Sequence, residues 1–376
     1  MIIGIDICSI PYGTGVSNYT LNLVRHLVRL DKKNFYKLFF CSFRQPLPTE
    51  ISKLASLPNV KIYHYRLPPT IFEILWNRLH IIPVELFIGK CDIFHTWDWT
   101  QPPTIKAKTI TTVHDFVPFL FPDKQHKRTI QAFKQKLYWA SRECSHFICV
   151  SQNTQKDLLR LFPKINPQKI SVIYEAPEDK YLRFAKLSSP SRAKKLSVIS
   201  SQYGLDKYVL AVGTREPRKN LDRLISAFTA YKKDNPGSKV ELAISGKYGW
   251  GQDISSLNKS IKILGYIPDK DIVALYAKAI CLAYPSLYEG FGLPILNAMV
   301  VGTPVITSDV SSMPEVAGKS AVYIDPLDIK NMTQTIEKVV KNTTLRHRLS
   351  KYGLSQSSKF SWTKAAQETL KIYQTL

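Results

Sequence analysis

A single carboxylate, Glu289, stands out in the sequence because of the turn that holds it. It lies in the stretch AYPSLYEGFGLPILNAMVVGTP, Ala283–Pro304, which is typical of a buried strand end, a glycine-containing turn and a helix. Phe291, Gly292 and Leu293 follow it closely and offer backbone N–H groups at the start of that helix. A carboxylate at a strand end, beside a helix N-terminus, suits a ligand that carries both hydroxyl groups and negative charge.

Cations crowd a second strand-to-helix turn. The strand predicted at Tyr208–Val212 runs into GTREPRKNLDRLISAF, where Arg215, Arg218 and Lys219 precede a helix that begins near Asn220. Cations beside a helix N-terminus can neutralise a diphosphate and donate hydrogen bonds to it. A solvated charged turn is the alternative that this pattern leaves open.

His114 and Asp115 follow the strand predicted at Thr109–Val113. The carboxyl end of a strand is where a doubly wound domain binds ligands, and the imidazole could donate to a sugar hydroxyl there. The alternative is a structural histidine, with Asp115 capping a turn.

Glycines mark three more strand-end loops. Gly13 and Gly15, in PYGTGVSNYT, permit a phosphate or a sugar to approach the N-terminus of the following helix, although a plain strand–helix turn fits equally well. The others are SGKYGWG, Ser245–Gly251, and GYIP, Gly265–Pro268. The first loop does not match the G-x-G-x-x-G fingerprint.

Asp269 and Asp271 form the one D-x-D pair of the sequence. This spacing can hold a divalent ion that bridges a diphosphate. Because the pair opens a predicted helix, where aspartates cap the end and complement the dipole, we favour capping. No other cluster has convincing metal-ligand spacing, and neither a G-x-S-x-G elbow nor a Walker-type loop occurs. We therefore predict no metal site.

Alternation of strands and helices positions these loops. The predicted strands are 2–7, 36–41, 60–65, 92–95, 109–113, 147–150 and 170–173, then 208–212, 240–244, 261–264, 280–284, 305–307 and 321–324. This pattern predicts parallel sheets covered on both faces, and the series restarts after a Ser-, Lys- and Pro-rich stretch that could contain a short helix at Ser191–Ser201. We expect two doubly wound α/β domains that face a central cleft: 1–180 and 207–360, joined by a linker at 181–206. The last helix, 361–376, could return to the first domain.

The composition indicates a globular chain. Its 376 residues are 44% hydrophobic and 22% charged, which excludes a disordered protein and favours two domains. The six cysteines are scattered without a C-x-x-C pair, which argues against a disulfide framework and fits a reducing cytoplasm. MIIGIDIC predicts a strand and no secretory signal, and charged residues and Pro83 interrupt the most apolar segment, Ile71–Ile88, so we expect no membrane-spanning helix.

The formal net charge of +23 is the compositional outlier. Lys and Arg exceed Asp and Glu by 15 in residues 1–200 and by 8 in residues 201–376. Such a field attracts polyanions: nucleotides, nucleic acid or an anionic membrane surface. The alternative is a soluble protein from a lysine-rich proteome, because net charge governs association and not fold.

A helix predicted over Gln125–Cys144 combines an apolar stripe with a set of cations. The stripe is Ile130, Phe133, Leu137, Ala140 and Cys144, and the cations that lie mostly away from it are Lys127, Arg128, Lys134, Lys136 and Arg142. With the apolar residues of Ile71–Ile88, this helix could rest on anionic lipid or grip an anionic acceptor. We favour core packing for the stripe and solvation for the cations.

Taken together, the chain resembles a family 4 glycosyltransferase of GT-B fold, a group that includes many bacterial mannosyl- and glucosyltransferases. The resemblance rests on the order and spacing of YGTGVSNY, TVHD, VSQNTQKDL, VGTREPRKNL, SGKYGW, GYIPDKDIVALY, PSLYEGFGLPILNAM and GTPVITSDVSSMPEVAG. It covers nearly the whole chain and implies two Rossmann-like domains, an acceptor-side domain at 1–180 and a nucleotide-sugar-binding domain at 207–360.

The resemblance implies roles around the donor sugar. Glu289 matches the first Glu of the E-x7-E motif and is expected to bind the sugar hydroxyls. Phe291, Gly292 and Leu293 would offer backbone N–H groups to the sugar and phosphates. His114 would line the sugar site near the anomeric carbon.

It also implies residues that bind the nucleotide. Lys219, with Arg218, would bind the diphosphate, and Gly15 would approach it from the opposite domain. Ile267 would contact the base through its main chain, and Gly246, in SGKYGW, belongs to the same donor-binding set.

Two positions depart from the family pattern. The second Glu of E-x7-E, which usually binds the ribose hydroxyls, is Asn297, so we expect weaker nucleotide binding because charge-assisted hydrogen bonds are lost. The basic residue expected directly after the strand-end glycine is Thr214, which makes Arg215 or Arg218 its substitute.

The resemblance predicts transfer of a hexose, with mannose favoured, from a nucleotide diphosphate sugar to a glycan or lipid-linked acceptor, with retention and without a metal. GDP-mannose is the first donor candidate and UDP-glucose the next. The expected location is the cytoplasm, at the inner face of the membrane if the chain contacts lipid. The alternatives are a GT-B scaffold with weakened catalysis, suggested by Asn297, and a basic nucleic-acid-binding protein, which we disfavour because the sequence contains no such module.

Overall fold

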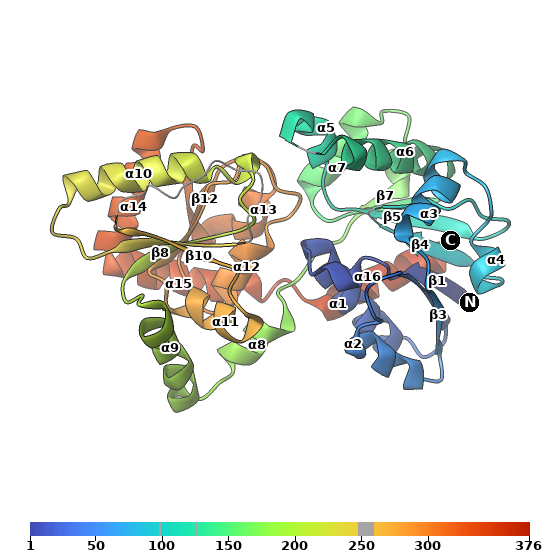
Figure 1. Ribbon diagram of the computed structural model, residues 1–376, viewed down its shortest axis with the longest axis horizontal. Helices are drawn as coiled ribbons and strands as arrows, with labels where there is room; N and C mark the ends of the chain where they lie inside the picture. Colours follow the sequence, from blue (N-terminus) through green and yellow to red (C-terminus); the bar gives the residue numbers. More distant parts are fainter. Residues whose placement is uncertain (98, 125, 247–258) are drawn as a thin grey trace. The chain divides into compact units, whose positions relative to one another are not determined.

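The chain folds into two compact units (Figure 1). A computed structural model describes residues 1–97, 99–124, 126–246 and 259–376. Unit 1 consists of Met1–Glu175 and Ser361–Leu376, and unit 2 is Ala176–Phe360. Each unit contains one parallel sheet and its own helices, as expected for a pair of Rossmann-like domains.

Unit 1 is built on a seven-stranded sheet in the order β3-β2-β1-β4-β5-β6-β7, with every neighbouring pair parallel. The strands are β1 (Ile2–Asp6), β2 (Phe35–Cys41), β3 (Val60–Tyr65), β4 (Ile93–Thr96), β5 (Lys108–Val113), β6 (His146–Cys149) and β7 (Ile170–Val172). The helices are α1 (Gly15–Leu30), α2 (Thr49–Ser52), α3 (Pro69–Phe72), α4 (Glu85–Ile88), α5 (Val117–Leu120), α6 (Lys127–Glu143), α7 (Gln152–Leu161) and α16 (Trp362–Thr375). Single turns are η1 (Ile10–Tyr12), η2 (Lys53–Ser56), η4 (Pro122–Lys124) and η5 (Pro167–Lys169), and η3 (Glu73–Arg78) is a π-helix.

Unit 2 is built on a six-stranded sheet in the order β10-β9-β8-β11-β12-β13, again with all pairs parallel. The strands are β8 (Tyr208–Val212), β9 (Glu241–Ser245), β10 (Ile261–Gly265), β11 (Cys281–Tyr284), β12 (Val305–Ser308) and β13 (Ala321–Ile324). The helices are α8 (Asp179–Ala185), α9 (Ser189–Tyr203), α10 (Leu221–Asp234), α11 (Asp269–Lys278), α12 (Leu293–Val300), α13 (Met313–Ala317), α14 (Ile329–Lys341) and α15 (Thr343–Ser357), with turns η6 (Pro217–Lys219) and η7 (Gly318–Ser320).

Central strands are buried along most of their length because helices cover both faces of a parallel sheet. In β8, Tyr208, Val209 and Leu210 are fully buried. Side chains from α10 and α14 complete this core, including Phe228 and Ile336. Burial of its side chains therefore holds β8 in the centre of its sheet.

The chain passes between the units earlier than the sequence predicts. The stretch 181–206, expected to be a linker, contains most of α8 and all of α9 and belongs to unit 2. The short helix suggested at Ser191–Ser201 is confirmed and is slightly longer: Pro190 occupies the first turn of α9, where proline is tolerated, and Gly204 closes the helix in the left-handed conformation. The unit boundary therefore lies at Glu175 and Ala176.

The C-terminal helix α16 returns to unit 1, as the sequence analysis anticipates. In Figure 1 it appears as a red helix within the unit that is otherwise blue and green. It packs against α1, and the ring of Trp362 meets Tyr19 edge-on at 5.7 Å. Ser361 caps α16 by accepting a hydrogen bond from the backbone N–H of Lys364.

Candidate active site

The candidate site of unit 2 lies where the strand order reverses. β8 and β11 are neighbours in the sheet although β9 and β10 lie between them in sequence. The loop 213–220 follows β8 and the loop 285–292 follows β11. Open parallel sheets bind ligands outside the carboxyl ends of their strands at such a switch point, so these two loops are where a ligand is expected.

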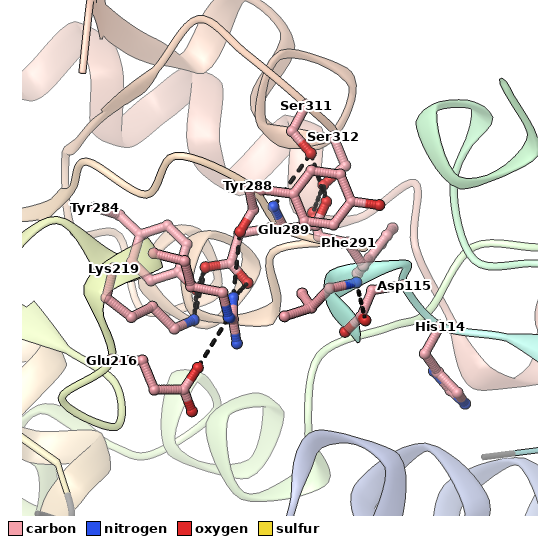
Figure 2. A network of polar contacts seen from close by, with 12 residues as sticks. His114, Asp115, Glu216, Lys219, Tyr284, Tyr288, Glu289, Phe291, Ser311 and Ser312 are labelled. Carbon is pink, nitrogen blue, oxygen red and sulfur yellow. Dashed lines mark hydrogen bonds and ion pairs between the residues drawn. The ribbon is translucent and has the colours of Figure 1, made fainter. Parts of the chain in front are cut away.

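Glu289 is the centre of a polar network that joins both loops (Figure 2). Its Oε1 accepts hydrogen bonds from Lys219 Nζ at 2.6 Å and from the Tyr284 hydroxyl at 2.8 Å. Its Oε2 accepts from Arg218 Nη1 at 2.9 Å, while Arg218 Nε donates to Glu216 at 2.9 Å. The network combines two cations with two carboxylates, so their formal charges cancel.

Burial makes these charges interact strongly. The side chains of Glu289, Lys219 and Arg218 are 9%, 11% and 15% exposed. Burial raises the pKa of Glu289, but Arg218 and Lys219 outweigh that effect and hold it at about 2. Burial also lowers the pKa of Lys219, and Arg218 lowers it further, because two cations share one carboxylate. Glu289 is therefore a firmly ionised anion.

The cationic loop is held in place by Asn220. This residue adopts a left-handed conformation with φ of 58°, which asparagine tolerates better than most residues. Its Nδ2 donates to the carbonyls of Pro285 and Pro326 at 3.1 and 2.6 Å. The Leu287 N–H donates to the Arg218 carbonyl at 2.8 Å. These hydrogen bonds fix the loop after β8 against the loop after β11.

Two serines hold the backbone of Glu289. Ser311 Oγ accepts from the Glu289 N–H at 3.1 Å and donates to its carbonyl at 2.6 Å. Ser312 Oγ lies 2.9 Å from the Glu289 carbonyl and 2.7 Å from the Phe291 carbonyl. Figure 2 shows both serines beside this turn. The carboxylate is thus positioned from its backbone as well as from its side chain.

The helix α12 begins directly after this turn. Gly292 is its N-cap, with φ of 112°, and Leu293 is its first residue. The first N–H groups of a helix have no partner within the helix, and its dipole favours negative charge there. The structure therefore places the backbone of Phe291, Gly292 and Leu293 at a helix N-terminus next to Glu289. Their contact with a donor remains a prediction.

Asn297, further along α12, is only 4% exposed. Its Nδ2 lies 3.4 Å from Glu178 Oε1, and within the described part of the chain its buried Oδ1 has no hydrogen-bond partner. Glu178 can only accept from the amide, so it fixes the amide orientation and leaves the oxygen as an acceptor. Lys180 pairs with Glu178 at 3.0 Å and with Asp269 at 2.6 Å.

His114 belongs to unit 1 and is 8% exposed. Its Nδ1 lies 3.1 Å from Glu175 Oε1, and the ring meets Tyr19 edge-on at 4.6 Å. An ionised Glu175 can only accept, so it favours the tautomer with the proton on Nδ1. Asp115 accepts from the Val117 N–H at 2.9 Å, which is the turn-capping role given in the sequence analysis as the alternative.

The two predicted glycines differ in what their surroundings require. A Cβ on Gly246 would lie 1.9 Å from the Gly213 carbonyl oxygen, so close packing of two strand ends demands glycine there. Gly15 is the first residue of α1, and a Cβ there would meet no described atom within 4 Å. Ile267 is 5% exposed and lies between β10 and α11. Donor contacts at all three remain predictions, and residues 247–251 of SGKYGWG lie outside the described residues.

Two family models match the chain and together span most of it. The model described as Glycosyltransferase Family 4 matches residues 13–176, and the model described as Glycosyl transferases group 1 matches residues 194–356. The chain belongs to glycosyltransferase family 4. This glycosyltransferase has the predicted GT-B fold, which consists of two Rossmann-like domains.

Curated relatives of this glycosyltransferase include two bacterial proteins. It is 29% identical over 378 residues to O-antigen chain mannosyltransferase B of Escherichia coli, with 96% of each chain covered. It is 29% identical over 256 residues to O-antigen chain mannosyltransferase RfbU of Salmonella typhimurium, covering 66% of this chain and 65% of that one. A solved structure of Anabaena HepE in complex with UDP and glucose matches 100% of both chains with a TM-score of 0.72 at 16% identity, which supports the fold.

Several residues of this glycosyltransferase's network could not be singled out from sequence. Glu216, Tyr284 and the two serines are ordinary loop and strand-end residues, and only the fold brings them to Glu289. Glu178 lies 119 positions from Asn297. Of the two proposed substitutes for the basic residue at Thr214, Arg218 is the one that contacts Glu289, whereas Arg215 is 5% exposed.

The D-x-D pair lies in the first turn of α11, where it complements the helix dipole, but the favoured capping role is wrong: the N-cap is Pro268, and no side chain among the described residues caps this helix. Asp271 accepts from the Tyr203 hydroxyl at 2.9 Å, and Asp269 pairs with Lys180 at 2.6 Å. In the described part of the chain, no group of three His, Cys, Asp or Glu side chains could hold a metal ion. Both aspartates therefore interact with other residues of unit 2.

The helix α6 carries one correction. Leu137, Ala140 and Cys144 pack in the core as favoured, but Lys136, expected on the outer face, is 1% exposed. Its ammonium donates to Thr111 Oγ1 at 2.5 Å, because the long side chain reaches the sheet. None of the helices in the described ranges is long and apolar enough to cross a membrane.

Proposed function

We propose that this glycosyltransferase moves a hexose, with mannose favoured, from a nucleotide diphosphate sugar to a hydroxyl group of a glycan or lipid-linked acceptor. The observation that carries the proposal is the buried ionised Glu289, flanked by two cations and a helix N-terminus at the β8/β11 switch point. This set offers an acceptor for sugar hydroxyls and donors for phosphates. Two relatives named as O-antigen mannosyltransferases support mannose and a role in cell-surface polysaccharide assembly.

In this proposal, Glu289 binds hydroxyls of the donor sugar, and Arg218 and Lys219 bind the diphosphate. Because both cations are paired with carboxylates in this structure, the phosphates must compete for them. Transfer passes through an oxocarbenium-like transition state with retention, and the cations stabilise the departing diphosphate. They supply the positive charge that a divalent ion would otherwise supply, so we propose a metal-independent reaction.

Other residues complete the proposed donor site. Asn297 Oδ1 is a buried acceptor available to a ribose hydroxyl, and Glu178 keeps it oriented. His114 is the proposed sugar-site residue of unit 1, with Glu175 as the group that positions it. Gly15 and Ile267 keep the roles that the family resemblance implies. Each of these roles is a proposal for this chain.

GDP-mannose is the favoured donor and UDP-glucose the alternative. The names of the two relatives support mannose, while the HepE complex shows UDP and glucose bound to a protein of the same fold. The test is a thermal-shift screen with GDP, UDP and ADP, followed by transfer from each matching nucleotide sugar, analysed by mass spectrometry. A chain that neither binds a nucleotide nor transfers a sugar would refute the proposal.

Arg218→Met sharpens that test. Glu289 keeps its hydrogen bond with Lys219 at 2.6 Å in this variant, so the fold should survive. We expect the affinity for the nucleotide diphosphate to fall by about tenfold or more, because a charge-assisted contact is worth about 1.5–3 kcal/mol. Lys262→Met is the matched control, since Lys262 pairs with Glu241 at the surface. Equal affinities in both variants would contradict the assignment of Arg218.

We further propose that unit 1 contacts an anionic membrane surface from the cytoplasmic side. Leu79, Ile81 and Leu86 are 57%, 47% and 68% exposed. His80, between the first two, stacks on Trp139 with ring centroids 3.7 Å apart, which holds this segment in place. Exposed aliphatic side chains combined with an excess of positive charge are typical of proteins that lie on membranes. The free cysteines of the described chain fit a reducing compartment.

Vesicle sedimentation tests the membrane proposal. The double variant Leu79→Ser, Leu86→Ser should bind phosphatidylglycerol vesicles more weakly than the wild type, because it loses apolar surface and keeps its charge. Leu354→Ser is the matched control, since Leu354 is 48% exposed in unit 2. Unchanged binding of the double variant, or absence of wild-type binding, would rule out this surface.

A further inference from the structure

A chain of hydrogen-bonded side chains runs through the interior of unit 1. It begins at Tyr373 of α16, whose hydroxyl lies 2.6 Å from Nδ1 of His95 in β4. His95 Nε2 lies 2.9 Å from Thr112 Oγ1 in β5. The same oxygen lies 3.2 Å from the hydroxyl of Tyr19 in α1. All four residues are at most 1% exposed, so the chain joins the helices α1 and α16 through two buried strands.

His95, in the middle of this chain, is neutral. Burial, together with the charge of Lys136, lowers the pKa of His95 to about 3. A neutral imidazole donates a hydrogen bond from one ring nitrogen and accepts one at the other. Tyr373 and Thr112 occupy both nitrogens of His95. The imidazole therefore links the two hydroxyl groups and holds each of them in place.

The chain reaches His114 through Tyr19. Thr112 lies in β5 and His114 directly follows that strand, so the alternation of side chains predicts that both face the same side of the sheet. Tyr19 contacts both residues, because its hydroxyl lies beside Thr112 and its ring meets the His114 ring at 85° with centroids 4.6 Å apart. Glu175 lies 3.1 Å from His114 Nδ1. An imidazole held at one nitrogen can still pivot about that contact, and the ring of Tyr19 restricts this motion.

Anchoring α16 to the sheet is the other role that the chain could have. Apolar packing already provides that anchor, since Trp362, Ala366 and Ile372 of α16 are buried. Buried polar groups lower stability unless each has a partner, and apolar side chains of the same shape would hold the helix equally well. What a satisfied polar chain adds is a fixed orientation of its members. The member that contacts the candidate sugar-site residue is Tyr19.

We propose that Tyr19 is a positioning residue for His114, because it fixes the plane of the imidazole. His95 and Tyr373 act on the same imidazole by way of Tyr19. The helix α16 thereby influences a residue of the candidate site from the interior of unit 1. The effect on sugar transfer rests on the proposed function, in which His114 lines the donor sugar, whereas the effect on the orientation of the imidazole does not.

NMR of the histidine rings tests the positioning without any substrate. The full chain is prepared with isotope-labelled histidine, and His114→Ala identifies the signals of His114 among those of the eight histidines. We expect Tyr19→Phe and Tyr373→Phe to shift or broaden the His114 ring signals, because the imidazole gains freedom to rotate. Tyr36→Phe is the matched control and should leave these signals unchanged. Tyr36 is equally buried in unit 1, but its hydroxyl donates to Asp31 at 2.7 Å.

Kinetics measure the consequence for transfer. Tyr373→Phe should lower kcat by about tenfold and leave the KM for the donor within about twofold, because a misplaced group at the reacting centre affects the transition state more than substrate binding. In a double-mutant cycle with His114→Ala, Tyr373→Phe should cause little further loss of kcat. A merely structural hydrogen bond would lower kcat by the same factor whether or not the His114 side chain is present.

Two results would overturn the inference. One is a set of His114 ring signals that is identical in the wild type, Tyr19→Phe and Tyr373→Phe, and the other is an equal loss of kcat in both backgrounds of the cycle. Melting curves identify a variant that fails to fold, and Thr112→Val then breaks the chain at a second place with a side chain of similar shape. The proposed function fails separately, through lack of sugar transfer, and in that case the ring signals still decide whether Tyr19 positions His114.

Discussion

Replacing Glu289 with glutamine tests the charge network directly. Gln keeps an oxygen that can accept from Lys219 and Tyr284, but it removes the negative charge that faces two buried cations. Glu289→Ala would also remove the hydrogen-bond acceptor, and breaking a buried ion pair in this way costs about 3–5 kcal/mol. Since a domain is stable by about 5–15 kcal/mol, the alanine variant risks unfolding unit 2, and glutamine is the informative change.

The size of the effect follows from the pKa of Glu289. Folding lowers this pKa from 4.5 to about 2, which corresponds to a contribution of about 3 kcal/mol to the free energy of unfolding. Because the folded pKa lies below the unfolded one, the contribution is complete above pH 4.5 and is lost as the pH falls toward 2. At pH 3.5 it should be smaller than at pH 7 by roughly 1 kcal/mol.

Urea denaturation of the wild type and Glu289→Gln, at several pH values between 7 and 3.5, measures this difference. We expect the unfolding transition of unit 2 to be destabilised by about 3 kcal/mol at pH 7, with the gap narrowing as the pH falls. The control Glu337→Gln, at an exposed pair with Lys341, should leave the curves nearly unchanged. A gap that stays constant with pH, or is absent at pH 7, would refute the electrostatic account.

Three further substitutions probe the surroundings of the site. Asn297→Glu places a second carboxylate beside Glu178 and should lower the free energy of unfolding by about 1–3 kcal/mol. Adding Glu178→Gln to this variant should restore the lost stability. Equal stability of the single and the double variant in urea would contradict the contact between Asn297 and Glu178. Gly246→Ala should lower the melting temperature of unit 2 by several degrees or prevent folding, because its Cβ would overlap the Gly213 carbonyl. Gly15→Ala should have the melting temperature of the wild type, since no described atom lies within 4 Å of the added Cβ. The variant should nevertheless raise the KM for the donor. An unchanged KM would show that Gly15 is not part of the donor site.

Most of the fold could be predicted from the sequence because buried strands are visible there as runs of mainly apolar residues. Every predicted strand is present with its ends within one residue, since strands covered on both faces are continuous apolar runs. The failure at 181–206 has a physical cause as well. α9 buries only Ile199 among its residues, so its sequence shows little helical periodicity. A short helix over Ser191–Ser201 is expected there, and the first-turn proline and closing glycine are the signals that could have extended it to its observed ends.

The candidate site was predictable in its anchors but not in their contacts. Glu289, Arg218 and Lys219 are visible because strand-end loops concentrate functional groups, and the fold brings them together. Glu216 could not be assigned, because a glutamate in a charged loop carries no sign of which cation it will meet. Glu178 reaches Asn297 only through tertiary structure. The local sequence pattern identifies the loops that form the candidate site. Tertiary structure determines which side chains contact one another there.

The neutral network has a consequence for donor binding that separates Glu289 from the cations beside it. Because Glu289 pairs with Arg218 and Lys219, its carboxylate competes with any phosphate for both cations. Glu289→Gln removes that competition, so GDP and UDP should bind this variant more tightly than the wild type, by about threefold to tenfold. Sugar transfer should nevertheless be lost, because the ionised acceptor for the sugar hydroxyls is gone. Calorimetry with the free nucleotides, alongside the transfer assay, measures both effects in one protein. Weaker nucleotide binding by Glu289→Gln in a correctly folded chain would show that Glu289 assists the phosphate site instead of competing with it.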